Sequence, residues 1–310
     1  MRILLTGGSG MLGSAIQKEL DSFGYEFSAP SSAELDLLSI TSTSEFVTGY
    51  QPNAIIHAAA RVGGIQANIN DPYRFLTENI VMDSNLFRIA TELRIQNLVY
   101  IGSTCMYPKD KLEALSELDL LTGPLEQTNE GYALSKIVGL KTVEIVSEQF
   151  GLNWRTFVPS NLYGPGDHFE IGRSHLLAAI MSKVWEAKES GSTEIEMWGD
   201  GTSRREFTYV NDVANFIVQS LEVLHSLPHY LNLGAGEDHS ISEYYETVCK
   251  LMSFEGEITR NLSMPTGMKR KLSSIELAKE FGWAPKTSLE EGIVETLSWF
   301  KAQKGAHNNV

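Results

Sequence analysis

The 310-residue chain carries a formal net charge of −14, with 39 acidic residues against 25 basic ones. This excess of negative charge argues against nucleic acids and anionic membranes as partners. Hydrophobic residues make up 42% of the chain, yet no apolar run is long enough to span a bilayer. The only two cysteines, Cys105 and Cys249, cannot form a disulfide framework. We therefore expect a globular cytoplasmic protein, and no residue cluster predicts a metal site.

The N-terminal segment has the pattern of a nucleotide-binding strand–loop–helix unit. Residues 2–6 are an apolar run that predicts a buried strand, and apolar residues then recur at helical spacing up to Phe23. Glycines between them would allow a tight turn, the approach of a pyrophosphate, and close helix packing. A glycine-rich turn without a ligand is the alternative. The predicted contacts in this loop are Gly7, Gly8, Ser9, Gly10, Met11, Leu12 and Gly13.

The second predicted strand, residues 25–29, bears on the choice of cofactor. It ends in Pro30-Ser31-Ser32 and lacks the acidic residue that usually holds the ribose 2′-hydroxyl of NAD. A 2′-phosphate would not be repelled there, so NADP(H) is favoured, although no arginine stands at the strand end to bind it.

Strands and helices alternate through the first half of the chain. Further strands are predicted at 53–60, 98–102 and 153–158, and a long amphipathic helix at 75–93. This order predicts an α/β fold with a doubly wound parallel sheet of the Rossmann type. Ser103 follows a strand end, at the edge of such a sheet where ligands bind.

Tyr132 and Lys136 stand four residues apart, on one face of a predicted helix. A neighbouring ammonium favours the phenolate, which would lower the pKa of Tyr132 and suit it to proton donation in a carbonyl reductase. A chance surface pair is the alternative.

The alternation loosens after Gly164. Helices are predicted at 174–188, 242–252 and 289–302, strands at 194–198 and 230–234, and an isolated strand near 257–260. Asn211-Asp212 would cap a helix that reaches Val223, and residues 305–310 would be a frayed tail. We expect a Rossmann domain at 1–163, to which 207–234 returns, and a substrate-binding lobe formed by 164–206 and 235–310.

These motifs resemble, over nearly the full length, the extended short-chain dehydrogenases/reductases that act on nucleotide sugars. Within them the chain is most similar to the GDP-L-fucose synthase family. The segments that carry the resemblance are Thr6–Gly13, His57–Ile65, Gly102–Pro108, Tyr132–Lys136, Asn161–Pro165, Ser174-His175, Trp198–Thr202 and Arg205–Phe207.

The resemblance implies NADPH-dependent 3,5-epimerisation and 4-reduction of GDP-4-keto-6-deoxy-D-mannose. Cys105 would be the base and His175 the acid of the epimerisation. Tyr132 would protonate the C4 oxygen, Ser103 would hold it, and Lys136 would tune Tyr132 and bind the nicotinamide ribose. Without the resemblance, Cys105 reads as a small buried residue and His175 as a structural or exposed one.

The family also implies binding residues outside the glycine loop. Asp36 would meet the adenine, or else be an acid at a helix N-terminus. Trp198 could equally be a core residue and Arg205 a surface charge, while Arg270-Lys271 reads as a solvated face. The implied cofactor contacts are Asp36, Ala59, Ile101, Gly102, Lys136, Pro159, Asn161, Leu162 and His175, and the implied substrate contacts are Lys183, Trp198 and Arg205.

Two segments depart from the family's common pattern, namely Met264–Gly267 and the stretch 166–173. Both would line the sugar pocket or its entrance, so the hexose stays open. Alternatives are the sugar of the GDP-colitose or GDP-6-deoxyheptose pathway, or the reductase half alone. A homodimer paired through helices at 72–93 and 132–150 is also expected. A redox-sensing regulator is the non-enzyme alternative, disfavoured by Ser103, Tyr132 and Lys136.

Overall fold

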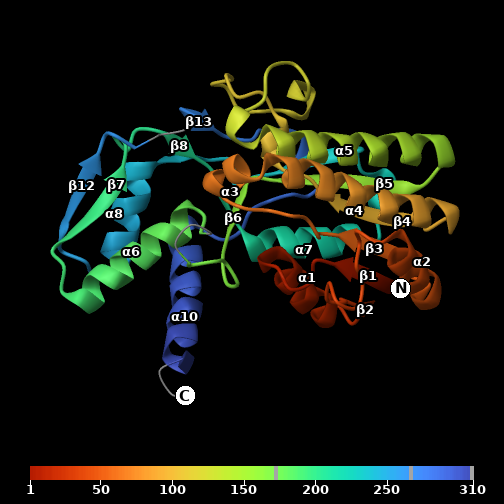
Figure 1. Cartoon of the computed structure of the whole chain (residues 1–310), viewed down its shortest axis with the longest axis horizontal. Coiled ribbons are helices and arrows are strands. Elements are labelled where there is room, and N and C mark those ends of the chain that lie inside the picture. Colours follow the sequence, from red (N-terminus) through yellow and green to blue (C-terminus); the bar gives the residue numbers. More distant parts are fainter. Residues whose placement is uncertain (171–173, 265–267, 308–310) are drawn as a thin grey trace.

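The computed structural model describes residues 1–170, 174–264 and 268–307. Within these ranges one sheet has six strands, all parallel, in the order β10-β5-β4-β3-β1-β2. This arrangement is the expected doubly wound sheet (Figure 1). The strands are β1 (Arg2–Thr6), β2 (Glu26–Ser28), β3 (Ala54–His57), β4 (Asn97–Ile101), β5 (Asn153–Pro159) and β10 (Tyr230–Leu233).

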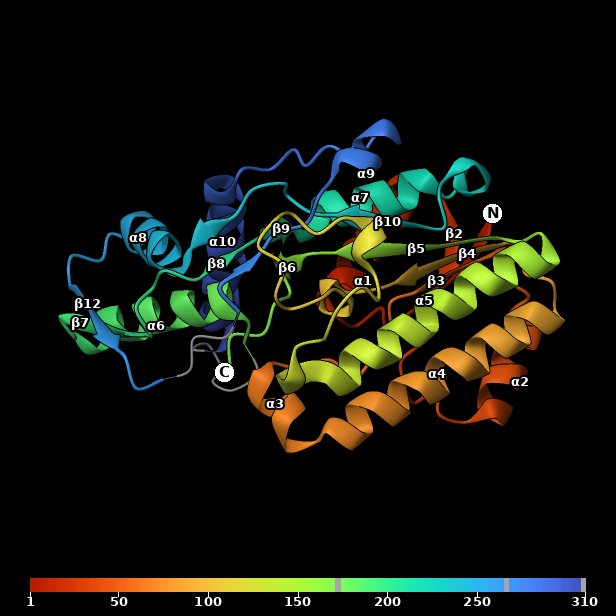
Figure 2. The same ribbon diagram turned by 90° about the horizontal axis from the view of Figure 1, so that it is seen from above.

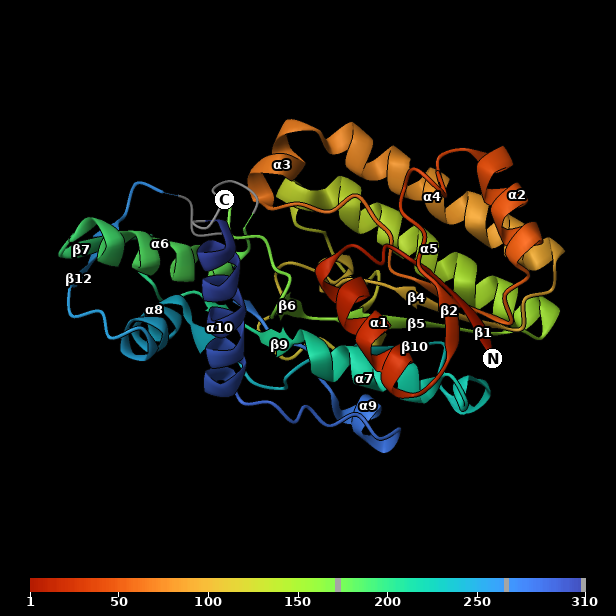
Figure 3. The ribbon, with the colours of Figure 1, turned by 90° about the horizontal axis from the view of Figure 1, so that it is seen from below.

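Helices cover both faces of this sheet. Alternate residues of a strand point to opposite faces, so Ile3 and Leu5 belong to one hydrophobic core and Leu4 to the other. Helices α4 and α5 lie side by side on one face (Figure 2), and α1 and α7 on the other (Figure 3). The helices of the two layers are α1 (Met11–Ser22), α2 (Ile40–Tyr50), α4 (Pro72–Glu92), α5 (Glu130–Phe150) and α7 (Val210–Ser220).

A smaller lobe carries its own hydrophobic core beside the sheet, on the left of Figure 1. Its strands are β7 (Glu194–Trp198) with β12 (Glu257–Asn261), and β8 (Arg204–Arg205) between β11 (His239–Ser240) and β13 (Arg270–Lys271). Its helices are α6 (Leu176–Ser190), α8 (Ile241–Leu251) and α10 (Leu289–His307). At the junction, β6 (Asn161–Tyr163) pairs with β9 (Phe207–Tyr209).

Short helices complete the described chain. Two are α-helices, α3 (Ile65–Asn70) and α9 (Glu276–Glu280). Four are 3₁₀ helices, η1 (Thr104–Met106), η2 (Glu117–Asp119), η3 (Gln127–Asn129) and η4 (Leu224–Ser226). Among the residues described, no helix is long and apolar enough to cross a membrane.

Several local predictions were wrong. Tyr209, not Asn211 or Asp212, caps α7, because Asp212 is already inside the helix and accepts the backbone N–H groups of Lys286 and Thr287. The strand near 257–260 is not isolated, since β12 pairs with β7. The third strand stops at His57, and α10 continues to His307 instead of fraying at 305. Positions 308–310 lie outside the described residues.

Candidate active site

The glycine loop joins β1 to α1 at the carboxyl edge of the sheet. Gly7 has a φ of 74°, and a Cβ there would lie 2.5 Å from the backbone nitrogen of Ala59. A Cβ on Gly13 would lie 2.1 Å from the Gly7 carbonyl oxygen, so α1 packs directly against the loop. Gly10 caps α1 without any side chain over the helix terminus. The backbone N–H groups of this terminus therefore suit a pyrophosphate.

The other loop residues support the same turn. The carbonyl oxygen of Gly8 accepts hydrogen bonds from the side chains of Ser14 and Gln17, at 3.2 and 2.8 Å. Ser9 is exposed beside them, whereas Met11 and Leu12 pack against the core below α1. Cofactor contacts in this loop would therefore come mainly from its backbone.

The end of β2 holds an acidic group that the sequence interpretation overlooked. Glu34 accepts hydrogen bonds from the backbone nitrogen and the hydroxyl of Ser31, both at 2.8 Å. Its carboxylate therefore stands where the sequence predicted no negative charge. Asp36 is exposed and accepts the N–H of Leu38, whereas Ser39 caps α2. The first turn of α2 holds no acidic residue, so the alternative that Asp36 is an acid at a helix N-terminus is wrong.

The remaining predicted cofactor contacts follow the ends of neighbouring strands or the junction. The Ala59 N–H points to the Thr6 hydroxyl at 3.4 Å, and Gly102 continues the β4–β5 ladder. Asn161 donates to the carbonyl oxygen of Glu206 at 2.9 Å. The parallel strands bring these segments to the carboxyl edge of the sheet. The predicted cofactor contacts at this edge are Ala59, Ile101, Gly102, Pro159, Asn161 and Leu162.

Tyr132, Lys136 and Ser103 meet at this edge. Desolvation and the neighbouring Cys105 raise the pKa of Tyr132 and outweigh the hydrogen bond with Ser103, which lowers it. This rise in the pKa of Tyr132 is opposite to the fall that the neighbouring Lys136 was predicted to cause. The ammonium of Lys136 instead donates to the Ile101 carbonyl oxygen at 2.9 Å and lies 4.5 Å from the ring centre of Tyr100. Tyr132 is accordingly protonated at neutral pH, as a proton donor must be.

Cys105 lies within η1, just after Ser103. Its backbone N–H donates to the Ser103 hydroxyl at 3.2 Å, so Ser103 also caps the local backbone at the start of η1. Its Sγ is half-buried and lies 3.1 Å from Asn129 Nδ2 and 3.5 Å from Lys271 Nζ. The thiol thus has a carboxamide and an ammonium as its polar neighbours.

The sequence interpretation missed Asn129 and Lys271. Lys271 was expected on a solvated face, but β13 pairs with β8 and brings its ammonium to the thiol. Arg270 also has a partner, since its guanidinium pairs with the Asp238 carboxylate. No periodicity signals these contacts, because Lys271 and Cys105 are 166 positions apart.

His175 comes from the second lobe, as the N-cap residue of α6. Desolvation and the neighbouring His168 lower its pKa, although the residue as a whole is exposed. The segment 171–173, where the sequence departs from the family pattern, lies outside the described residues, as do positions 265–267.

The three predicted substrate contacts occupy the second lobe. Lys183 Nζ donates to the Glu196 carbonyl oxygen at 2.8 Å and lies 5.5 Å from the ring centre of Trp198. Trp198 is 49% exposed, which excludes the alternative that it is a core residue. Arg205 donates to the carbonyl oxygens of Arg204 and Met268, so it is not the free surface charge of the other alternative.

A cavity of about 190 Å³ lies next to the thiol's partner Asn129, at the start of α5. The side-chain carbonyl oxygens of Asn68 and Asn129 are buried without a hydrogen-bond partner among the described residues. Both residues line this cavity, but these two oxygens have almost no accessible surface within it. Its lining is Asn68, Ile69, Pro72, Gln127, Thr128, Asn129, Glu130 and Gly131.

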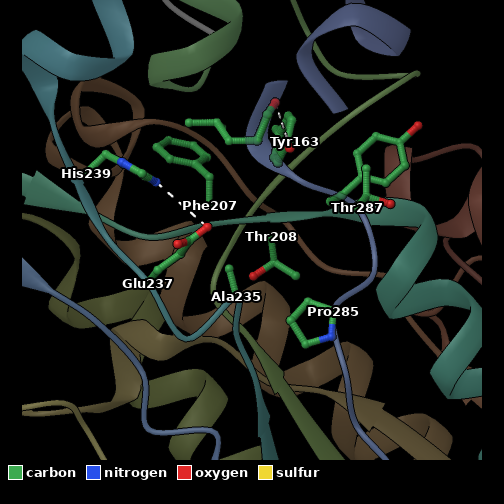
Figure 4. A pocket seen from close by; sticks show the side chains of 10 residues that line it. Tyr163, Phe207, Thr208, Ala235, Glu237, His239, Pro285 and Thr287 are labelled. Atoms are coloured by element: carbon green, nitrogen blue, oxygen red, sulfur yellow. Dashed lines mark hydrogen bonds and ion pairs between the residues drawn. The ribbon is translucent and has the colours of Figure 1, made fainter. Parts of the chain in front are cut away.

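A second hollow lies between the lobes and has a different character (Figure 4). Tyr163, Phe207 and Thr208 from β6 and β9 line it, with Glu237 and His239 opposite. Its volume of about 20 Å³ admits no more than a water molecule. The chemistry therefore belongs at the sheet edge and not in this hollow.

Comparisons with known proteins identify the family of this chain. Residues 3–234 match the model of the NAD dependent epimerase/dehydratase family. The GDP-L-colitose synthase of Yersinia pseudotuberculosis is 45% identical over 305 residues, covering 98% of this chain and 99% of that protein. The GDP-L-fucose synthase of Escherichia coli is 34% identical over 308 residues, covering 96% of each.

A solved structure extends the likeness to the fold. The GDP-mannoheptose C4 reductase from Campylobacter jejuni, with NADP bound, superposes with a TM-score of 0.89 at 28% identity, covering 97% of this chain and 98% of that one. The chain therefore belongs to the NAD dependent epimerase/dehydratase family and, within the extended short-chain dehydrogenases/reductases, to the group that includes the GDP-L-fucose synthases.

Proposed function

We propose that this protein catalyses the NADPH-dependent 3,5-epimerisation and 4-reduction of GDP-4-keto-6-deoxy-D-mannose to GDP-L-fucose. The observation that carries the proposal is a thiol set between an ammonium and a carboxamide, beside a tyrosine, serine and lysine. A reductase alone has no use for the thiol, whereas an epimerase needs a base. The similarity to a GDP-L-fucose synthase supports the same substrate class.

The epimerisation uses the acidity that a C4 ketone gives to the hydrogens at C3 and C5. Cys105, as thiolate, takes a proton from the carbon, and the electron pair moves into an enolate at the C4 oxygen. His175 returns a proton to the opposite face, and its lowered pKa makes its protonated form a stronger acid. Asn129 and Lys271 hold the sulfur in place.

The reduction then uses the protonated phenol. The nicotinamide cofactor supplies a hydride to C4 when bound. Tyr132 gives its proton to the C4 oxygen, and Ser103 holds that oxygen by a hydrogen bond. Lys136 binds the nicotinamide ribose. The glycine loop and the strand ends, with Asp36, would hold the rest of the dinucleotide.

The second lobe is proposed to bind the GDP moiety. We assign residues 164–206 and 235–310 to this substrate-binding lobe and residues 1–163 with 207–234 to the NADP-binding domain, although Ile275, Ala278 and Trp283 pack in the core of the sheet. Trp198 offers an exposed ring for the guanine and Lys183 a cation beside it. Arg205 would offer its guanidinium to the diphosphate.

The function is tested by supplying GDP-4-keto-6-deoxymannose with NADPH, and in parallel with NADH because of Glu34. We expect NADPH oxidation and GDP-L-fucose as product; the absence of turnover would contradict the proposal. Without reduced cofactor, deuterium from D₂O should enter C3 and C5. Cys105→Ser should lose this exchange while cofactor binding is retained, as measured by quenching of protein fluorescence.

A second substrate has its own support. The 45% identity to a GDP-L-colitose synthase makes GDP-4-keto-3,6-dideoxymannose the alternative. The two sugars differ at C3, where the colitose precursor has no hydroxyl. Turnover of both sugars under identical conditions, compared as kcat/KM, decides which one is the substrate.

A homodimer paired through α4 and α5 is also proposed. These neighbouring helices expose apolar side chains in the single chain, among them Tyr73 at 72%, Val138 at 44% and Ile145 at 57%. Exposed apolar side chains on two adjacent helices suit burial against a second copy of the same helices.

A further inference from the structure

A buried polar chain runs under the Tyr132–Lys136 pair, and the proposed reaction gives it no role. Asp83 of α4, only 3% exposed, accepts a hydrogen bond from the Tyr100 hydroxyl at 2.6 Å. Its other oxygen lies 2.9 Å from His57 Nε2, and His57 Nδ1 lies 2.6 Å from the Thr6 hydroxyl. The chain thus links β1, β3, β4 and α4 in the protein interior.

One assignment of donors and acceptors gives every group in this polar chain a partner. The Thr6 oxygen accepts the Ala59 N–H, and we assign its own proton to the hydrogen bond with His57 Nδ1. A ring that accepts at Nδ1 carries its proton on Nε2 and donates it to Asp83. Asp83 then receives two donors, one from His57 and one from Tyr100, which is what a carboxylate requires. A single negative charge therefore lies between α4 and α5.

Lys136 is the cation that this charge balances. Its side chain is 2% exposed, and its ammonium lies over the ring whose hydroxyl binds Asp83. A phenol that donates to a carboxylate has a more electron-rich ring, which strengthens its attraction for a cation. Desolvation lowers the pKa of Lys136 and Asp83 opposes that shift. The other groups around the ammonium are Tyr132 on α5 and, beyond Asp83, His57 on β3.

We propose that Asp83, held by Tyr100 and His57, is the counter-charge that keeps Lys136 protonated in the buried site. Asp83 is thus a positioning residue for the Tyr132–Lys136 pair and acts through Lys136. The role of the pair in reduction rests on the proposed function, but the protonation of Lys136 does not.

The test is a pH titration of the Lys136 side-chain nitrogen by NMR in protein labelled with ¹⁵N-lysine. The Lys136 signal is assigned by its absence in Lys136→Met. In Asp83→Asn, which keeps the size of the side chain but removes its charge, the midpoint should fall by about one pH unit or more, a tenfold change in proton affinity. Tyr100→Phe keeps the ring under the ammonium but releases the carboxylate, so it should lower the midpoint by a smaller amount.

Asn85→Ala is the matched control. Asn85 is on the same helix as Asp83, and its carboxamide donates to the Leu37 carbonyl oxygen at 2.8 Å, outside the hydrogen bonds that connect Asp83, Tyr100 and His57. The titration midpoint of Lys136 in Asn85→Ala should equal that of the wild type. An unchanged midpoint in Asp83→Asn would overturn the proposal, and if that variant does not fold, an unchanged midpoint in Tyr100→Phe would do so.

Kinetics supply an independent check on the reduction step. If the wild type reduces the keto sugar, Asp83→Asn should lose at least tenfold in kcat, and its activity should decline at a lower pH than that of the wild type. Failure of the wild type to turn over any keto sugar would contradict the proposed function while leaving the NMR result to decide the role of Asp83.

Discussion

Lys271 and Cys105 illustrate how this site obtains its chemistry from residues far apart in the chain. A thiol at a strand end is a common feature, and a basic pair on an edge strand is usually solvated. The pairing of β13 with β8 places the Lys271 ammonium 3.5 Å from the thiol, and Asn129 approaches the same sulfur. The proposed base thus gains the positive neighbour that a reactive cysteine needs.

Replacing Lys271 by Met should slow the chemistry of Cys105 because the thiolate loses its neighbouring cation. We expect the rate of alkylation by iodoacetamide at pH 7.5, followed by mass spectrometry of the Cys105 peptide, to fall several-fold. Deuterium exchange at C3 and C5 of the substrate should fall with it. Lys269→Met, at an exposed position two residues away, is the control and should change neither rate. Equal alkylation rates in all three proteins would exclude this role for Lys271.

At the scale of elements, Glu206 ties the segments around the site together. It lies between β8 and β9 and is 1% exposed. Its carboxyl oxygens accept the N–H groups of Gly236, after β10, and Ser273, after β13, at 2.8 and 2.9 Å. One side chain therefore fixes the segment directly after β13, the strand that carries Lys271, relative to the sheet.

This residue should make stability depend on pH. Burial raises the pKa of Glu206 from 4.5 to about 7. Between these values the unfolded chain has lost a proton that the folded protein still holds, so wild-type stability falls as pH rises through this window and then levels off. Glu206→Gln cannot titrate, so its free energy of unfolding relative to wild type should rise between pH 4.5 and 7.5, by up to about 3 kcal/mol.

Urea unfolding at several pH values measures this difference. Glu237→Gln, at the neighbouring exposed Glu237, is the control and should follow the wild-type curve. Glu206→Gln will itself weaken one hydrogen bond at every pH, so only the slope with pH bears on the prediction. Parallel curves for Glu206→Gln and wild type would refute it.

Gly139 of α5 lies close to both Tyr100 of β4 and Asp83 of α4. A Cβ on Gly139 would lie 2.3 Å from the Tyr100 hydroxyl and 2.7 Å from Asp83 Oδ2. Gly139→Ala should therefore destabilise the protein by about 1–3 kcal/mol, because the helices must separate. Gly49→Ala in α2 meets nothing within 4 Å and should stabilise it by about 0.5–1 kcal/mol. Thermal unfolding of both variants checks this, and equal effects would show that helix propensity alone decides.

The whole molecule shows which features its sequence could predict. The parallel sheet was predictable because apolar runs, glycine turns and amphipathic helices repeat locally from Arg2 to Pro159. The smaller lobe was less predictable, because its strands β8, β11 and β13 have two residues each and exist only through pairing with distant segments. The Asp83 chain and the Lys271 contact depend on the same long-range packing. Local sequence patterns thus indicated what kind of site to expect, whereas the charged groups around it are brought together by tertiary contacts.

The proposed homodimer would bury exposed apolar side chains of α5. On α5, Leu134 and Val138 stand one helical turn apart and are 40% and 44% exposed, so both would be buried against a second copy. Val138→Glu would place a charge in that dry interface and should convert a dimer into a monomer. Light scattering after size-exclusion chromatography measures the mass. Val223→Glu is the control, because Val223 is also 44% exposed but follows α7 on the opposite face of the sheet, and this variant should remain dimeric. A monomeric wild type, or a Val138→Glu protein that is still dimeric, would rule out pairing through α4 and α5.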